Sequence, residues 1–189
     1  MKIYDISKEL FSTTVFPGDP VPAKRPVHQL EKGDHCNLTE LTLGSHSGTH
    51  FDAPCHFVLG GKTIDQVDLN RCVGPCQVVE ASGTVDQSWA KAVLETGVQR
   101  LLIKGEMQLS VEAAQELAKH LLLVGVEAMS VSPMGEPTPV HVALLSQEVG
   151  VLENLDLSAV TPGEYFLCAA PIKLGGLDGA QVRPVLVEN

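Results

Sequence analysis

The sequence predicts a mixed α/β fold in which residues 1–189 form a single domain. A length of 189 residues suits one domain. Short aliphatic runs typical of buried strands recur along the chain, and fewer segments have helical composition and spacing. With 44% hydrophobic but only 4% aromatic residues, we expect a mostly aliphatic core.

The elements predicted for the first half are strands. Residues 1–10 are expected to form a strand anchored by Ile3 and Ile6, and residues 11–19 a loop that ends at a Pro-Gly turn. Residues 37–43 alternate with period two, which predicts a strand leading into a histidine-rich segment. Residues 76–80 and 101–104 are apolar runs typical of buried strands.

The second half contains the helical signals. Residues 86–96 and 110–120 have helical composition, and Ser110 is suited to cap the second helix. Residues 121–126 predict a buried strand and residues 139–147 a short helix. Further strands are expected from Leu152 and over residues 165–170 and 182–187, so two or three helices accompany many strands.

The segment 45–56 carries a cluster of potential metal ligands: His46, His50, Asp52 and His56. All four positions are even, and side chains two residues apart in an extended chain share one face. We therefore expect the four to point one way and Phe51 the other. Glycines and a proline in this segment oppose a helix. Imidazoles converging with a carboxylate predict a site for Zn²⁺ or Mn²⁺.

Two residues distant in sequence, His141 and Glu153, are further candidate ligands. Glu153 stands in an apolar stretch, where a buried carboxylate needs a partner or a metal. From the residues alone, a surface or capping role is favoured for each, and His46, His50 and Asp52 would suffice for one ion.

Composition excludes several kinds of partner. The formal net charge of −10 argues against binding to nucleic acid or to anionic membranes. We find no transmembrane run or secretory leader, which predicts a cytoplasmic protein. Five cysteines, an odd number, do not suggest a disulfide framework. A purely structural zinc site would favour four closed Cys/His ligands, which this cluster does not resemble.

The histidine-rich segment resembles the signature of the cyclase family, His-x-Gly-Thr-His-x-Asp-x-Pro-x-His. This family includes metal-dependent kynurenine formamidases (arylformamidases) and isatin hydrolases. The likeness continues over residues 3–7, 15–19, 69–75, 152–155, 170–174 and 183–185, which is essentially the whole chain. The resemblance implies a swivelling β/β/α fold around a mixed, barrel-like sheet, usually in a homo-oligomer, here a homodimer or homotetramer.

The resemblance also implies roles for residues. One ion would be held by His46, His50 and Asp52, and Asp52 would bridge to a second ion held by two further ligands, His141 and Glu153. His56 would be the catalytic acid/base, and Phe16, which stands where kynurenine formamidases usually carry Trp, would pack on the substrate ring.

The implied activity is hydrolysis of an aryl formamide such as N-formylkynurenine, by attack of metal-bound hydroxide on the amide carbonyl. The alternatives are a cyclic amide such as isatin or another family substrate and, less favoured, a non-catalytic metal-binding protein. We expect Zn²⁺, as one or two ions, with Mn²⁺ as the alternative. The substrate would be a small molecule.

Overall fold

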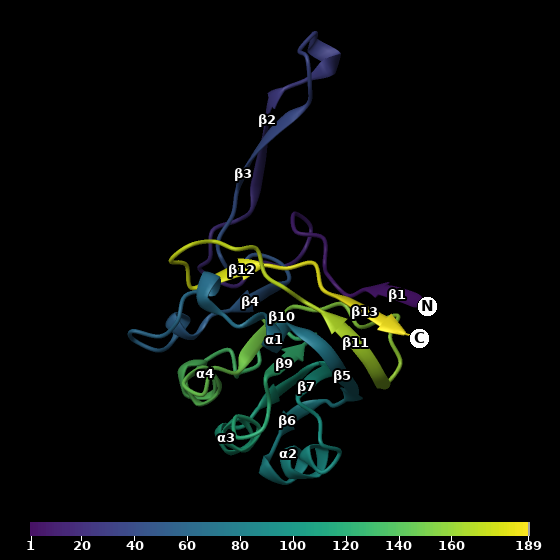
Figure 1. The fold of residues 1–189 in the computed structure, drawn as a ribbon. Coiled ribbons are helices and arrows are strands. Elements are labelled where there is room, and N and C mark those ends of the chain that lie inside the picture. The colour runs from purple at the N-terminus through teal and green to yellow at the C-terminus, as the bar shows by residue number, and fades with distance from the viewer. Residues whose placement is uncertain (189) are drawn as a thin grey trace.

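A computed structural model describes residues 1–188. Its centre is a curled sheet of nine strands in the order β1-β13-β11-β5-β7-β9-β10-β4-β12 (Figure 1). In chain order these strands are β1 (Lys2–Asp5), β4 (His50–Asp52), β5 (Val73–Glu80), β7 (Arg100–Lys104), β9 (Leu123–Val126), β10 (Gly150–Glu153), β11 (Gly163–Cys168), β12 (Gly179–Gln181) and β13 (Val185–Glu188). The mixed α/β class and the barrel-like sheet expected from the sequence are confirmed.

The middle of the sheet is parallel and its flanks are antiparallel. Strands β5, β7, β9 and β10 run parallel to one another, whereas β4 pairs antiparallel with both β10 and β12. Helices α2 (Gln87–Leu94), α3 (Val111–Leu117) and α4 (Thr138–Leu145) cover one face of the parallel strands (Figure 1). The single-turn helix α1 (Leu69–Cys72) precedes β5.

The core lies on both faces of the sheet. Leu101 and Ile103 of β7 are fully buried against the helices, while Leu102 between them packs inside the curl of the sheet. Such alternation follows from side chains pointing to opposite faces along a strand. Both faces of the central strands are therefore covered, which explains their continuous apolar sequence.

A hairpin arm, residues 21–43, extends away from this body (Figure 1). Its strands β2 (Ala23–His28) and β3 (Leu38–Thr42) pair with each other and are exposed along their whole length. The sequence predicted β3 but not β2, because Pro26 and the charged residues of β2 mask its strand character. A second small pair joins β6 (Gly83–Val85) and β8 (Met107–Leu109).

The remaining predicted elements are present with bounds that differ by a few residues. The helices expected over residues 86–96, 110–120 and 139–147 correspond to α2, α3 and α4. Within residues 1–188, the helices are too short or too polar to cross a membrane.

Candidate metal centre

Strand register places His50 and Glu153 side by side. β4 lies between β10 and β12, and His50 is directly opposite Glu153 on β10. Opposed residues of antiparallel strands share a face, and Asp52 shares it too because it is two residues further along β4. Phe51 points to the other face, where it is fully buried. The expectation of ligands on one side and Phe51 on the other is confirmed within this strand.

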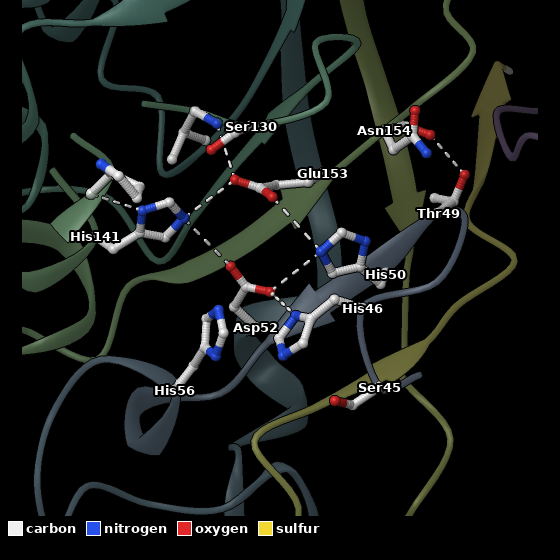
Figure 2. Close-up of polar contacts among 12 residues, drawn as sticks. Ser45, His46, Thr49, His50, Asp52, His56, Ser130, His141, Glu153 and Asn154 are labelled. Atoms are coloured by element: carbon white, nitrogen blue, oxygen red, sulfur yellow. Dashed lines mark hydrogen bonds and ion pairs between the residues drawn. The ribbon is translucent and has the colours of Figure 1, made fainter. Parts of the chain in front are cut away.

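Helix α4 contributes His141 to the same face. Its Nε2 lies 3.2 Å from Glu153 Oε1 and 3.6 Å from Asp52 Oδ2 (Figure 2). The other ring nitrogen, Nδ1, lies 2.9 Å from the carbonyl oxygen of Pro137, the residue before the helix. A backbone acceptor at Nδ1 fixes the orientation of the ring, so that Nε2 is the nitrogen that faces the two carboxylates.

His46 and His56 reach the site differently from the sequence prediction of one extended segment. His46 lies in a turn closed by the hydrogen bond from Ser47 N to Gly44 O, and His56 ends a 3-10 helix, Pro54–His56. The extended segment is shorter than predicted because Gly48 has a left-handed φ of +68° and Pro54 begins a helix.

The rings of His46 and His56 nevertheless come together. They stack with centroids 3.9 Å apart, and His46 Nδ1 lies 2.8 Å from Asp52 Oδ1. Figure 2 shows the imidazoles of His46, His50 and His141 around the carboxylates of Asp52 and Glu153. By contrast, three other histidines are exposed and lie outside this cluster: His28, His35 and His120.

The buried carboxylates are held in their charged form. Burial alone would raise the pKa of Asp52, but hydrogen bonds from His46 and His50 outweigh burial and hold this pKa well below its ordinary value. Burial likewise opposes charge on His50, yet hydrogen bonds to Asp52 and Glu153 raise its pKa to about 10. In the metal-free chain, protons on the imidazoles therefore balance the carboxylates, and a bound cation would replace them.

The donor set fits a divalent cation. Among residues 1–188, Asp52 Oδ2 is the buried side-chain polar atom that has no hydrogen-bond partner. Ligand atoms of His50, Asp52 and Glu153 lie within 4.8 Å of one another, and so do those of His46, Asp52 and His56. Asp52 belongs to both groups, and such nitrogen and carboxylate donors suit Zn²⁺, Mn²⁺ or Fe²⁺.

A cavity of about 200 Å³ opens onto this cluster. Its lining includes the predicted substrate residue, Phe16, together with His56 and Glu153. Phe57 lines it as well, and its ring stacks on that of His141 with centroids 4.4 Å apart. Phe57 was not predicted from the sequence, although it stands directly after the signature.

Asp178 is a second residue that the sequence analysis missed. Its Oδ2 lies 3.1 Å from His46 Nε2 and 3.4 Å from His56 Nδ1. Burial raises the pKa of Asp178, but hydrogen bonds from His46 and Ser45 outweigh it and keep this pKa below its ordinary value. Nothing in the surrounding Gly-rich segment marks this aspartate in the sequence.

The curled mixed sheet and the buried His/Asp/Glu cluster define an α/β protein whose donor set fits a metal ion. The chain belongs to the cyclase family: residues 4–133 match the sequence model described as "Putative cyclase". It is 33% identical to a kynurenine formamidase from Polaromonas naphthalenivorans (strain CJ2), over 100% of this chain and 92% of that protein.

Solved structures share the fold. A predicted metal-dependent hydrolase from Bacillus stearothermophilus superposes with a TM-score of 0.80 at 28% identity, over 98% of this chain and 97% of that one. Isatin hydrolase A from Ralstonia solanacearum gives a TM-score of 0.83 at 19% identity, over 99% and 92% of the two chains. At 19% identity, this second likeness concerns the fold alone.

Proposed function

We propose that this protein is a metal-dependent amidohydrolase that removes the formyl group from an aryl formamide resembling N-formylkynurenine. The observation that carries the proposal is the buried cluster of imidazoles and carboxylates at the base of a small, partly aromatic cavity. The 33% identity to a kynurenine formamidase along the full chain supports a formamide as the substrate. The proposed metal ligands are His46, His50, Asp52, His141 and Glu153.

We infer one or two ions, Zn²⁺ first and Mn²⁺ as the alternative. Support for two ions comes from Asp52, which belongs to both groups of donor atoms. When bound, a divalent cation supplies Lewis acidity, which lowers the pKa of water and polarises a carbonyl oxygen.

His56 is the proposed proton carrier. Burial lowers the pKa of His56 below 6.5, so the ring is largely neutral at pH 7 and can accept a proton. In hydrolysis a C–O bond forms between water and the formyl carbon, and the C–N bond breaks. His56 takes a proton from the attacking water and gives it to the departing nitrogen. The products are an arylamine and formic acid, which releases its proton to solvent and becomes formate.

Phe16 and Phe57 are the proposed contacts for the substrate ring. Both line the cavity, and flat apolar side chains suit an aromatic ring. A cyclic amide such as isatin would use the same walls and remains the alternative. We rank the formamide first because the full-length relative at 33% identity is a formamidase, whereas the isatin hydrolase shares only the fold.

The test is a pair of assays on one preparation. Metal content is measured on purified protein, and hydrolysis of N-formylkynurenine and of isatin is followed with and without chelator. We expect a higher kcat/KM for N-formylkynurenine, loss of activity on chelation and recovery with Zn²⁺ or Mn²⁺. Full activity after exhaustive chelation would overturn the metal-dependent mechanism. A higher kcat/KM for isatin would favour the cyclic amide, and metal-loaded protein inactive on both would favour a non-catalytic metal-binding protein.

We further propose that the protein is a homodimer or homotetramer in which a second copy covers the hairpin arm. Two-stranded hairpins are marginally stable in water, and Val27, Leu30, Leu38 and Leu41 on this arm are 43% to 56% exposed. The arm has three basic and three acidic residues, so its formal net charge is zero although that of the whole chain is −10. It can therefore contact a second, negatively charged copy of the chain with little electrostatic repulsion.

Light scattering tests the oligomer. We expect an oligomer for the native protein and a shift toward monomer for a Leu38→Glu/Leu41→Glu variant. A monomeric native protein would overturn the proposal. The cytoplasmic location and the single-domain organisation stay predictions.

A further inference from the structure

Asp178 contacts both a proposed metal ligand and the proposed proton carrier. One carboxylate oxygen, Oδ2, faces Nε2 of His46 at 3.1 Å and Nδ1 of His56 at 3.4 Å. Each of these rings has its other nitrogen on the opposite edge. For His46 that nitrogen is Nδ1, which lies 2.8 Å from Asp52 Oδ1. Asp178 therefore lies on the edge of the His46 ring that faces away from Asp52, and the same oxygen reaches His56.

The backbone fixes Asp178 in this place. Its own carbonyl oxygen accepts a hydrogen bond from Ala53 N at 2.9 Å, and that of Leu177 accepts one from Ile64 N at 2.9 Å. The following residue, Gly179, begins β12 and pairs with Asp52 of β4. Although the side chain of Asp178 is 43% exposed, its Cα is thus tied to the strand that carries the ligands.

The other two proposed histidine ligands show the same arrangement with different acceptors. His50 Nδ1 lies 2.9 Å from Gly48 O, and His141 Nδ1 lies 2.9 Å from Pro137 O, so that in both rings Nε2 faces carboxylates. Histidines that bind metals usually donate their second N–H to a carbonyl or carboxylate, which fixes the tautomer and the ring orientation. For His46 the acceptor in this position is Asp178.

We propose that Asp178 is a positioning residue for both rings. It accepts the Nε2–H of His46, which leaves the lone pair of Nδ1 for a metal beside Asp52. It also accepts the Nδ1–H of His56, which leaves Nε2 to exchange protons in the cavity. The part concerning His56 rests on the proposed hydrolase function, whereas the part concerning His46 requires only that the cluster binds a metal.

The experiment compares Asp178→Ala and Asp178→Asn with a control, Asp65→Asn. Asp65 accepts a hydrogen bond from Gly176 N at 2.9 Å, so the control removes one negative charge beside the same loop without touching either ring. The dissociation constant for Zn²⁺ is measured by competition with a chelator. Imidazole ¹⁵N shifts of the Zn²⁺-loaded protein report which nitrogen of His46 binds the metal. Then kcat and KM for N-formylkynurenine are measured at saturating Zn²⁺.

We expect about 10- to 100-fold weaker Zn²⁺ binding for Asp178→Ala, as is usual when the partner of a metal-binding histidine is removed. Asp178→Asn keeps an acceptor oxygen and should lose less. The native protein should show His46 bound through Nδ1 with Nε2 protonated. At saturating Zn²⁺, kcat should fall in Asp178→Ala with KM little changed, and the Asp65→Asn control should retain native values.

Three results would overturn the proposal: native Zn²⁺ affinity and kcat in Asp178→Ala, coordination of His46 through Nε2, or equal losses in Asp65→Asn. These outcomes are separable from failure of the proposed function. If the native protein hydrolyses no amide, the affinity and the ¹⁵N shifts still test the role of Asp178 toward His46. If the native protein is active and the Asp178 variants match it, the function stands and the positioning role fails.

Discussion

A methyl group added at Gly179 should push His46 out of place. A Cβ built at this position would lie 2.7 Å from His46 Cε1 and 3.0 Å from the carbonyl oxygen of Phe51. Real Cβ contacts essentially never fall below 3.0 Å and ordinary contact begins near 3.4 Å, so the ring must move by 0.3 to 0.7 Å, the differences from 2.7 Å. Metal–ligand distances tolerate only about 0.2 Å. The Gly179→Ala variant should therefore bind metal more weakly.

The magnitude follows from the cost of overpacking, typically about 1–3 kcal/mol. Without metal the His46 ring can turn away from the new methyl group, whereas coordination would force it back, so most of this cost falls on the metal-bound state. At about 1.4 kcal/mol per tenfold, affinity for Zn²⁺ should drop roughly 5- to 150-fold.

Chelator competition measures this change, with Gly175→Ala as the control on the same loop. Among the described residues, a Cβ at Gly175 would meet no heavy atom within 4 Å. We expect native affinity for the control. Native affinity in Gly179→Ala would refute the argument that this glycine makes room for a ligand.

Three further predictions concern the site and the core. His56→Ala should lower kcat by about 10²–10⁴-fold with metal content near native, and a loss of metal would instead make His56 a ligand. Asp52→Asn should lose metal at both groups of donors, because it removes the charge they share; elemental analysis showing full occupancy would contradict this. Burial raises the pKa of the Cys72 and Cys76 thiols to about 12, from 9.0. Below pH 9 the thiols are neutral in both the folded and the unfolded chain. Above pH 9 they ionise first in the unfolded chain. Stability in urea unfolding should thus fall between pH 9 and 12, by at most about 1.4 kcal/mol per pH unit and thiol, and less steeply in a Cys72→Ala/Cys76→Ala variant.

Much of the fold could be predicted because its signals are local. The buried strands around Leu102 and Val124 are continuous apolar runs, and Ser110 caps α3 by accepting a hydrogen bond from Ala113 N at 3.1 Å. The arm was only half predicted, since β2 carries Pro26 and no alternating pattern. Neither face of the hairpin arm is buried, so burial does not require its residues to alternate between apolar and polar.

Only part of the candidate site could be predicted from patterns in the sequence. Period-two spacing placed His50 and Phe51 on opposite faces because both lie in β4. The same argument gave the wrong local structure for His46 and His56, which a turn and a 3-10 helix deliver instead. Asp178 could not be predicted, because its role depends on the pairing of β12 with β4 across more than a hundred residues.

The placement of β4 in the sheet also sets the order of events during biosynthesis. Residues 50–52 are translated about a hundred residues before both neighbours of β4, which lie at residues 150–153 and 179–181. Such distant pairings form slowly and only after the later segments exist. A partly made polypeptide thus holds the His-rich signature without Glu153, and the donor group of His50, Asp52 and Glu153 can assemble only after residues 150–153 have been made.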